Sequence, residues 1–221
     1  MPRPARGAAL LALPFDAEAA IRHLSAKDAR LGRLIERVGP LELRIYRQNP
    51  FEALSESIVY QQLHGRAAAA IFARMVRLFH PRRFPRPEDL LEVPDERLRS
   101  AGLSRGKIAA IRDLAAKTID GTVPRMRDLK LLSDDEIVER LSAVRGIGRW
   151  TAEMLLIFRL GRPDVLPATD FGVRKGFARA YRRKEMPAPK ELLAFGEKWR
   201  PYRTVASWYL WRAAELPGSA P

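Results

Sequence analysis

The sequence of 221 residues contains no cysteine. This absence excludes disulfide bonds, thiolate zinc sites, cysteine-ligated iron–sulfur clusters and a cysteine nucleophile. It also fits a cytoplasmic protein, because disulfides are rare in that compartment. Long apolar runs are missing as well, since none approaches the roughly 20 residues of a membrane-spanning helix. We therefore expect a cytoplasmic protein that does not span a membrane.

Acidic residues are too few to balance the basic ones. The chain carries 40 Lys and Arg against 26 Asp and Glu, a net charge of +14. The basic residues are spread along the whole chain, which favours a docking surface over a charged tail. A surplus of this size indicates an anionic partner, either nucleic acid or an acidic membrane surface. Because charged and apolar residues alternate as in packed helices, we expect nucleic acid as the partner and no membrane partner.

Strand patterns are sparse, and "LELRIY" (41–46) alternates alone. Most other segments have helical periodicity, and prolines separate them. Ser133 and Glu136 have the spacing of a capping box, which predicts a helix start. We therefore predict an all-α fold. The expected helical segments are residues 16–39, 50–63, 66–79, 95–121, 133–144, 149–160, 170–181, 191–199 and 202–216.

The stretch "LSAVRGIGRWTAEML" (141–155) places Gly146 and Gly148 between two helical patterns. Glycine tolerates the positive φ of a tight turn and lets another molecule approach closely. The bare N–H groups at the start of the second helix suit a phosphate, and Ile147 at the tip can pack back to close the hairpin. The alternative is a plain helix–helix turn with a glycine C-cap.

This stretch resembles the helix-hairpin-helix motif of base-excision DNA glycosylases. That superfamily places an essential aspartate after a Gly/Pro-rich loop, and here "GRPDVLPATD" (161–170) ends in Asp170. Upstream, "SIVYQQLHGRAA" (57–68) resembles the segment that fills the gap left by an extruded base. Downstream, "WRPYRTVASWYLWRAAE" (199–215) resembles the C-terminal helix of the 3-methyladenine DNA glycosylase II family. The resemblance covers roughly residues 15–215.

The resemblance implies two helical lobes with the active site in the cleft between them. Residues 46–155 would form a central bundle that ends in the hairpin, 141–155. Residues 1–45 and 156–221 would form the terminal lobe. The implied partner is double-stranded DNA that contains damaged bases, bound by a monomer, and no cofactor is required.

Loss of the base leaves oxocarbenium-like charge on the sugar, which a carboxylate can stabilise. Asp170 is the candidate; the alternative is that it only caps the helix that follows. Glycosylases that also cut the strand carry a lysine where this chain has Trp150, and an indole cannot form a Schiff base. It can stack on a flipped, positively charged base. Met154 and Trp211 complete the expected base pocket, and core packing is the alternative for both tryptophans.

The same register assigns the DNA contacts. One of Gln61, Gln62 and Leu63 would wedge into the duplex, with Gln62 preferred. Main-chain carbonyls of Ser142, Val144 and Gly146 would hold a sodium or potassium ion. The hairpin residues expected at the phosphates are Arg145, Gly146, Ile147, Gly148, Arg149 and Thr151.

These expectations together describe a monofunctional hydrolase that removes alkylated bases, such as 3-methyladenine and 7-methylguanine, in base excision repair. It would have no abasic-site lyase activity. Two alternatives stay open: the same fold acting on deaminated or oxidised bases, and a non-catalytic DNA-binding module. A carboxylate facing DNA argues against the second, because it gives a pure DNA binder no advantage.

Overall fold

The computed structural model describes residues 10–216, and these divide into two compact units. Unit 1 is the continuous segment 47–155, and unit 2 combines residues 10–46 with 156–216. Residues 1–9 and 217–221, which belong to the predicted terminal lobe, lie outside the described residues. No helix within residues 10–216 is long and apolar enough to cross a membrane.

The prediction of an all-α fold is confirmed. Unit 1 contains α3 (Pro50–Tyr60), α4 (Gly65–Arg77), α5 (Pro87–Glu92), α6 (Asp95–Ser100), α7 (Arg105–Ile119), α8 (Met126–Leu129), α9 (Asp134–Ser142) and α10 (Arg149–Leu155). Unit 2 contains α1 (Ala17–Lys27), α2 (Ala29–Val38), the π-helix η1 (Leu156–Leu160), α11 (Phe171–Ala180), α12 (Pro189–Gly196), the 3-10 helix η2 (Glu197–Trp199) and α13 (Arg203–Glu215). Within the described residues, strand structure is limited to the antiparallel pair β1 (Leu10–Leu11) and β2 (Ile45–Tyr46).

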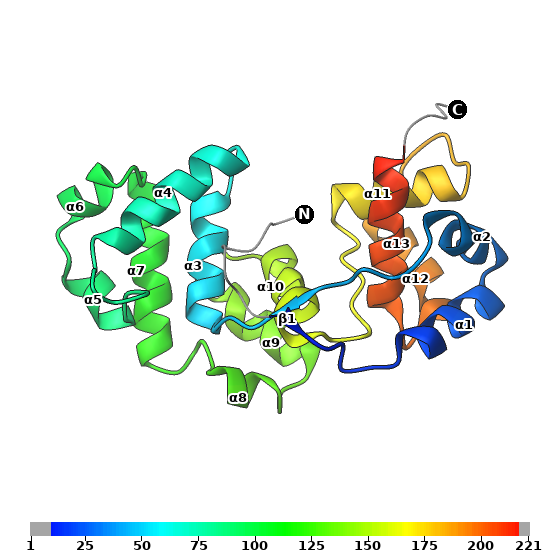
Figure 1. Ribbon diagram of the computed structural model, residues 1–221, viewed down its shortest axis with the longest axis horizontal. Helices are drawn as coiled ribbons and strands as arrows, with labels where there is room; N and C mark the ends of the chain where they lie inside the picture. Colours follow the sequence, from blue (N-terminus) through cyan, green and yellow to red (C-terminus); the bar gives the residue numbers. More distant parts are fainter. Residues whose placement is uncertain (1–9, 217–221) are drawn as a thin grey trace. The chain divides into compact units, whose positions relative to one another are not determined.

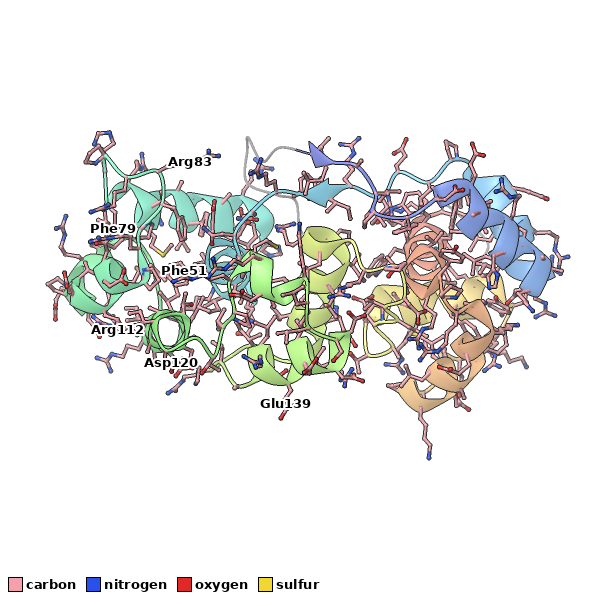
Figure 2. The ribbon with its side chains drawn as sticks, turned by 90° about the horizontal axis from the view of Figure 1, so that it is seen from below. Phe51, Phe79, Arg83, Arg112, Asp120 and Glu139 are labelled. Carbon is pink, nitrogen blue, oxygen red and sulfur yellow. The ribbon has the colours of Figure 1, made fainter. Side chains whose placement is uncertain are left out.

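The core of unit 1 forms around α7, which packs against both α3 and α5. Phe51, Leu54 and Ile58 of α3 are buried on one face, as the helical periodicity predicts. Arg112 of α7, labelled with Phe51 in Figure 2, donates to the carbonyls of Leu91 at 2.6 Å and Val93 at 2.7 Å. This guanidinium therefore satisfies carbonyls at the C-terminal end of α5, which the helix itself cannot satisfy.

Unit 2 is organised by the contact between α11 and α13 (Figure 1). The two helices approach so closely at Gly176 that a Cβ there would overlap the carbonyl of Leu210. Phe177, Trp199 and Tyr209 are among the largest fully buried side chains of the molecule. Burial of these aromatic rings supplies much of the hydrophobic stabilisation of this unit.

Two of the differences from the predicted helices concern α3 and α10. The helix expected at 50–63 ends at Tyr60, and Gln61–Leu63 form a turn in which Gln62 has a positive φ of 58°. The helix expected at 149–160 changes from α to π geometry at Leu156. The apolar run in this segment is buried in either geometry, so the sequence pattern does not distinguish them. Such π-turns are frequent at functional sites.

Candidate active site

The hairpin joins α9 to α10 within unit 1. The capping box that starts α9 is present: Ser133 Oγ accepts from the Glu136 N–H at 3.3 Å, and Glu136 Oε2 accepts from the Ser133 N–H at 2.8 Å. The turn that follows α9 contains Gly146 at φ +78°, a conformation that favours glycine. Ile147 is buried, as expected for a side chain that holds the hairpin closed.

Gly148 differs from Gly146 in its surroundings. Its φ is not in the left-handed region, and a Cβ would meet no described atom within 4 Å. No contact inside the described part of the protein therefore requires a glycine there. Because glycine has no side chain to cap α10, it leaves the first N–H groups of that helix without an acceptor from the capping residue. These are the features that a bound phosphate would use.

The hairpin is tied to the end of α3. Gln61 Nε2 donates to the Gly146 carbonyl at 2.8 Å. Lys107 Nζ in turn donates to the carbonyls of Gln61 at 2.9 Å and Val59 at 2.5 Å. Burial lowers the pKa of Lys107. Gln61 is thus held between α7 and the hairpin, whereas Gln62 and Leu63 are exposed.

A second tie joins the hairpin to α7. Asp113 Oδ2 accepts from the Arg145 N–H at 2.7 Å and from Lys117 Nζ at 2.7 Å. Burial raises the pKa of Asp113, but the donors from Arg145 and Lys117 lower it more, and the net pKa is below its usual value. Sequence reasoning missed Lys107 and Asp113, because a lone charge on a helix carries no signal of its tertiary partner.

The side chains predicted to bind DNA differ in exposure. Arg145, Gly146, Gly148 and Arg149 are exposed, while Ile147 and Thr151 are buried. Arg149 also lies 3.5 Å from the buried carboxylate of Glu153. Trp150 is 42% exposed, and Met154 on the same helix is buried. This exposure distinguishes Trp150 from a core tryptophan, which would be covered.

The monovalent ion predicted at the hairpin remains a prediction. Of the three carbonyls, Val144 already accepts from the Ile147 N–H at 3.0 Å, and Gly146 accepts from Gln61. A carbonyl oxygen has a second lone pair, so both carbonyls keep a lone pair that an ion could use.

Asp170 caps α11 in unit 2 and accepts a hydrogen bond from Trp211. Its Oδ1 accepts from the Val173 N–H at 2.8 Å and from Trp211 Nε1 at 2.8 Å. Trp211 is 7% exposed and stacks on Phe158, with ring centroids 5.8 Å apart. Asp170 therefore caps α11, and the two N–H donors also fix the direction of its carboxylate. Buried packing, the alternative considered for Trp211, is likewise present.

Gly172 makes room for the bond between Asp170 and Trp211. A Cβ at this position would lie 2.9 Å from Trp211 Cδ1 and 3.1 Å from Asp170 Oδ1. Sequence reasoning did not single out Gly172, although a glycine two residues after a capping aspartate is a signal it could have used. The loop before Asp170 is fixed from α13, because Thr204 Oγ1 accepts from the Val165 N–H at 3.0 Å.

Comparisons with known proteins identify the family of the chain. Residues 56–201 match the family of HhH-GPD superfamily base excision DNA repair proteins. The chain is 39% identical over 196 residues to DNA-3-methyladenine glycosylase 1 of Schizosaccharomyces pombe, covering 88% of this chain and 86% of that protein.

Solved structures show the same relationship. A DNA-3-methyladenine glycosidase from Bacillus halodurans superposes with a TM-score of 0.81 at 38% identity, covering 93% of this chain and 92% of that one. A 3-methyladenine DNA glycosylase of Schizosaccharomyces pombe in complex with abasic DNA gives a TM-score of 0.79 at 38% identity, covering 90% and 97%. The chain therefore belongs to the HhH-GPD superfamily of base excision DNA repair proteins.

Proposed function

We propose that this protein is a monofunctional DNA glycosylase that removes alkylated bases such as 3-methyladenine and 7-methylguanine from duplex DNA. The observation that carries the proposal is Asp170, which ends the Gly/Pro-rich loop after the hairpin and is oriented by two N–H donors. The similarity to named 3-methyladenine glycosylases supports the substrate class. Residence in the cytoplasm belongs to the same proposal and is supported by the lack of cysteine.

The reaction follows from the chemistry of these groups. The damaged nucleotide leaves the duplex, at a cost of a few kcal/mol in lost stacking and pairing. Gln62 or Leu63, both of which are exposed, would fill the gap, and Trp150 would stack on the flipped base. The glycosidic bond then breaks, and its electron pair leaves with the base. The Asp170 carboxylate stabilises the positive charge on the sugar, orients the water whose oxygen bonds to C1′ and accepts the proton that this water loses.

Release of the base is then the end of the reaction. Cutting the strand through a Schiff base needs an amine, and the indole of Trp150 supplies none. The abasic DNA product therefore stays intact until alkali breaks it. Methylated duplex DNA should release free 3-methyladenine or 7-methylguanine, with strand breaks only after hot alkali. Breaks without alkali would contradict the monofunctional assignment, and release of deaminated or oxidised bases alone would contradict the substrate class.

The variant Asp170→Asn tests the residue. Asparagine is also a good N-cap and keeps an oxygen for Trp211 Nε1, so the fold should persist. We expect base release to be abolished and DNA binding to be unchanged or tighter, as measured by single-turnover release and by fluorescence anisotropy.

The matched control is Asp16→Asn. Asp16 caps α1 in the same unit and accepts from the N–H groups of Glu18 and Ala19. The chemical change is identical, but this carboxylate does not follow the hairpin motif. Base release should therefore persist in the control. Unchanged release by the Asp170 variant would remove Asp170 from the mechanism.

A further inference from the structure

A basic pocket lies in unit 2 between α2 and the C-terminal end of α11. Its volume is about 490 Å³, and it is lined by Arg30, Arg33, Leu34, Arg37, Ala180 and Arg182. Four of these six residues are arginines, and no acidic side chain lines the pocket. Asp170 caps the opposite end of α11, a helix of ten residues, so helix geometry places the pocket roughly 15 Å along that helix from the carboxylate.

The sequence of α2 aligns three of the arginines. Arg30, Arg33 and Arg37 follow one another at spacings of three and four residues, which puts them on one helical face. Leu31 and Ile35 are buried on the other side of the helix. The row spans roughly 10 Å at the rise of an α-helix.

Buried hydrogen bonds hold the wall of this pocket in place. Arg30 Nη1 donates to the carbonyl of Tyr181 at 2.8 Å. The Tyr181 hydroxyl donates to Asp28 Oδ2 at 2.5 Å, and Asp28 Oδ1 caps the first turn of α2. Trp199 Nε1 also donates to Asp28 Oδ2, at 3.0 Å. These bonds fix the start of α2 against the end of α11, so the arginine row has a defined position.

Arg182 occupies an unusual backbone conformation. Its φ is +52°, just after the end of α11, where helices usually place glycine. The N–H of the next residue, Arg183, bonds to the Ala178 carbonyl at 2.8 Å and closes the turn. A left-handed conformation is strained for any residue that carries a Cβ. Glycine would make the same turn at lower cost, so what arginine adds here is its guanidinium.

The pocket lacks counter-charges within the described residues. The side chains of Arg33, Arg37 and Arg182 have no hydrogen bond or ion pair there, and all three are exposed. Clustered cations repel one another, and an anion bound among them removes that repulsion. The guanidinium fork matches two oxygens of a phosphate.

We propose that this pocket is a second DNA-backbone site, which binds phosphate groups away from the damaged base. Each strand of duplex DNA presents a phosphate about every 3.4 Å along its axis, so a row of roughly 10 Å can meet more than one. The inference rests on the proposed DNA-binding function but not on catalysis. Its role would be to add sequence-independent affinity and to slow dissociation from undamaged DNA.

The double variant Arg33→Gln, Arg37→Gln tests the site. Both side chains are exposed, so the fold should be retained. Binding of undamaged 30-base-pair duplex is measured by anisotropy over a range of salt concentrations. The slope of log affinity against log salt should decrease in magnitude by roughly two, one for each lost phosphate contact. Single-turnover base release at saturating enzyme should be unchanged, and absence of release by the wild type would indicate failure of the proposed function instead.

The control is Arg22→Gln, Arg44→Gln, which removes the same charge from exposed positions of unit 2 outside the pocket. An equal change of slope in both double variants, or no change in either, would overturn the proposal. Two further results would overturn it if the salt slope does not change. Loss of polyglutamate binding would indicate an acidic protein partner, and a rise in Tm with inorganic phosphate would indicate a free anion.

Arg182→Gly provides an independent readout. Glycine relieves the left-handed backbone while removing the guanidinium, so Tm should stay the same or rise while the salt slope decreases in magnitude by about one. A purely structural Arg182 would show the reverse, a lower Tm with an unchanged slope.

Discussion

At the hairpin, Gly146 adopts a φ of +78°, whereas Gly148 has an ordinary backbone and open space around the position of a Cβ. The two glycines should therefore respond differently to the same substitution. Gly146→Ala should lower the free energy of unfolding by roughly 1–2 kcal/mol, because it forces a side chain into the left-handed region. Gly148→Ala should change that free energy by less than about 0.5 kcal/mol but weaken DNA affinity about tenfold, or ~1.4 kcal/mol.

Urea unfolding and anisotropy with duplex DNA measure the two quantities on the same preparations. The reason for the expected loss of affinity is that a methyl group at 148 separates a phosphate from the N–H groups at the start of α10. If Gly148→Ala binds DNA like the wild type, the Gly-Ile-Gly stretch is a plain helix–helix turn, and the phosphate role must be given up.

Single residues were predictable where the chemistry is local. The sequence identified Asp170 as a candidate for catalysis and for helix capping, and the structure shows the capping hydrogen bond directly. It could not separate Trp150 from Trp211, because exposure depends on what the rest of the chain covers. The bond from Gln61 to the Gly146 carbonyl joins residues 85 positions apart, and no local pattern encodes it.

At the scale of helices, caps and periodicity predicted most of the elements. The capping box at Ser133 and the buried face of α3 are examples. The short helices α5 and α8, of six and four residues, were missed, since segments this short seldom show a clear period. The end of α3 at Tyr60 was also missed. Lys107 of α7 stabilises this helix end, because its ammonium group donates to the carbonyls of Val59 and Gln61.

Asp28 connects several helices of unit 2 and makes their stability depend on pH. Burial raises the pKa of Asp28, but the hydrogen bonds from Lys198, Tyr181 and Trp199 together lower it by more, so the net pKa lies below the ordinary 3.8. A carboxyl group with a lowered folded-state pKa contributes stability above its unfolded pKa, near 4, and loses it as pH falls through the folded value. Asp28→Asn should reduce the unfolding free energy at pH 7 by about 2 kcal/mol or more.

Urea unfolding at pH 7, 5, 4 and 3 measures this effect. The difference between wild type and Asp28→Asn should be constant from pH 7 to 5 and become smaller below about pH 4, where the unfolded carboxyl begins to take up protons. Asp16→Asn, an exposed cap, should show a much smaller difference at every pH. A difference that grows as pH falls would mean that Asp28 is protonated in the folded protein.

At the scale of the whole molecule, binding and chemistry depend on different groups. We expect the net charge of +14 to attract the DNA backbone through residues of both units, including the hairpin arginines and the proposed pocket. In the proposed mechanism bond cleavage depends on one carboxylate, which the N–H groups of Val173 and Trp211 orient. Salt screens the attraction between exposed charges but leaves these short, partly buried hydrogen bonds in place.

We therefore expect salt to separate the two steps. Raising it from about 50 to 200 mM should weaken binding of lesion-containing duplex by roughly 10³-fold if six phosphates are contacted. The single-turnover rate constant of base release, with enzyme saturating at each salt concentration, should change by less than about twofold. Asp170→Asn should bind with the same salt slope as the wild type, because its carboxylate neutralises no phosphate. A saturated rate constant that falls in parallel with affinity would mean that screened charges also stabilise the transition state, and the catalytic role could then not be assigned to Asp170 alone.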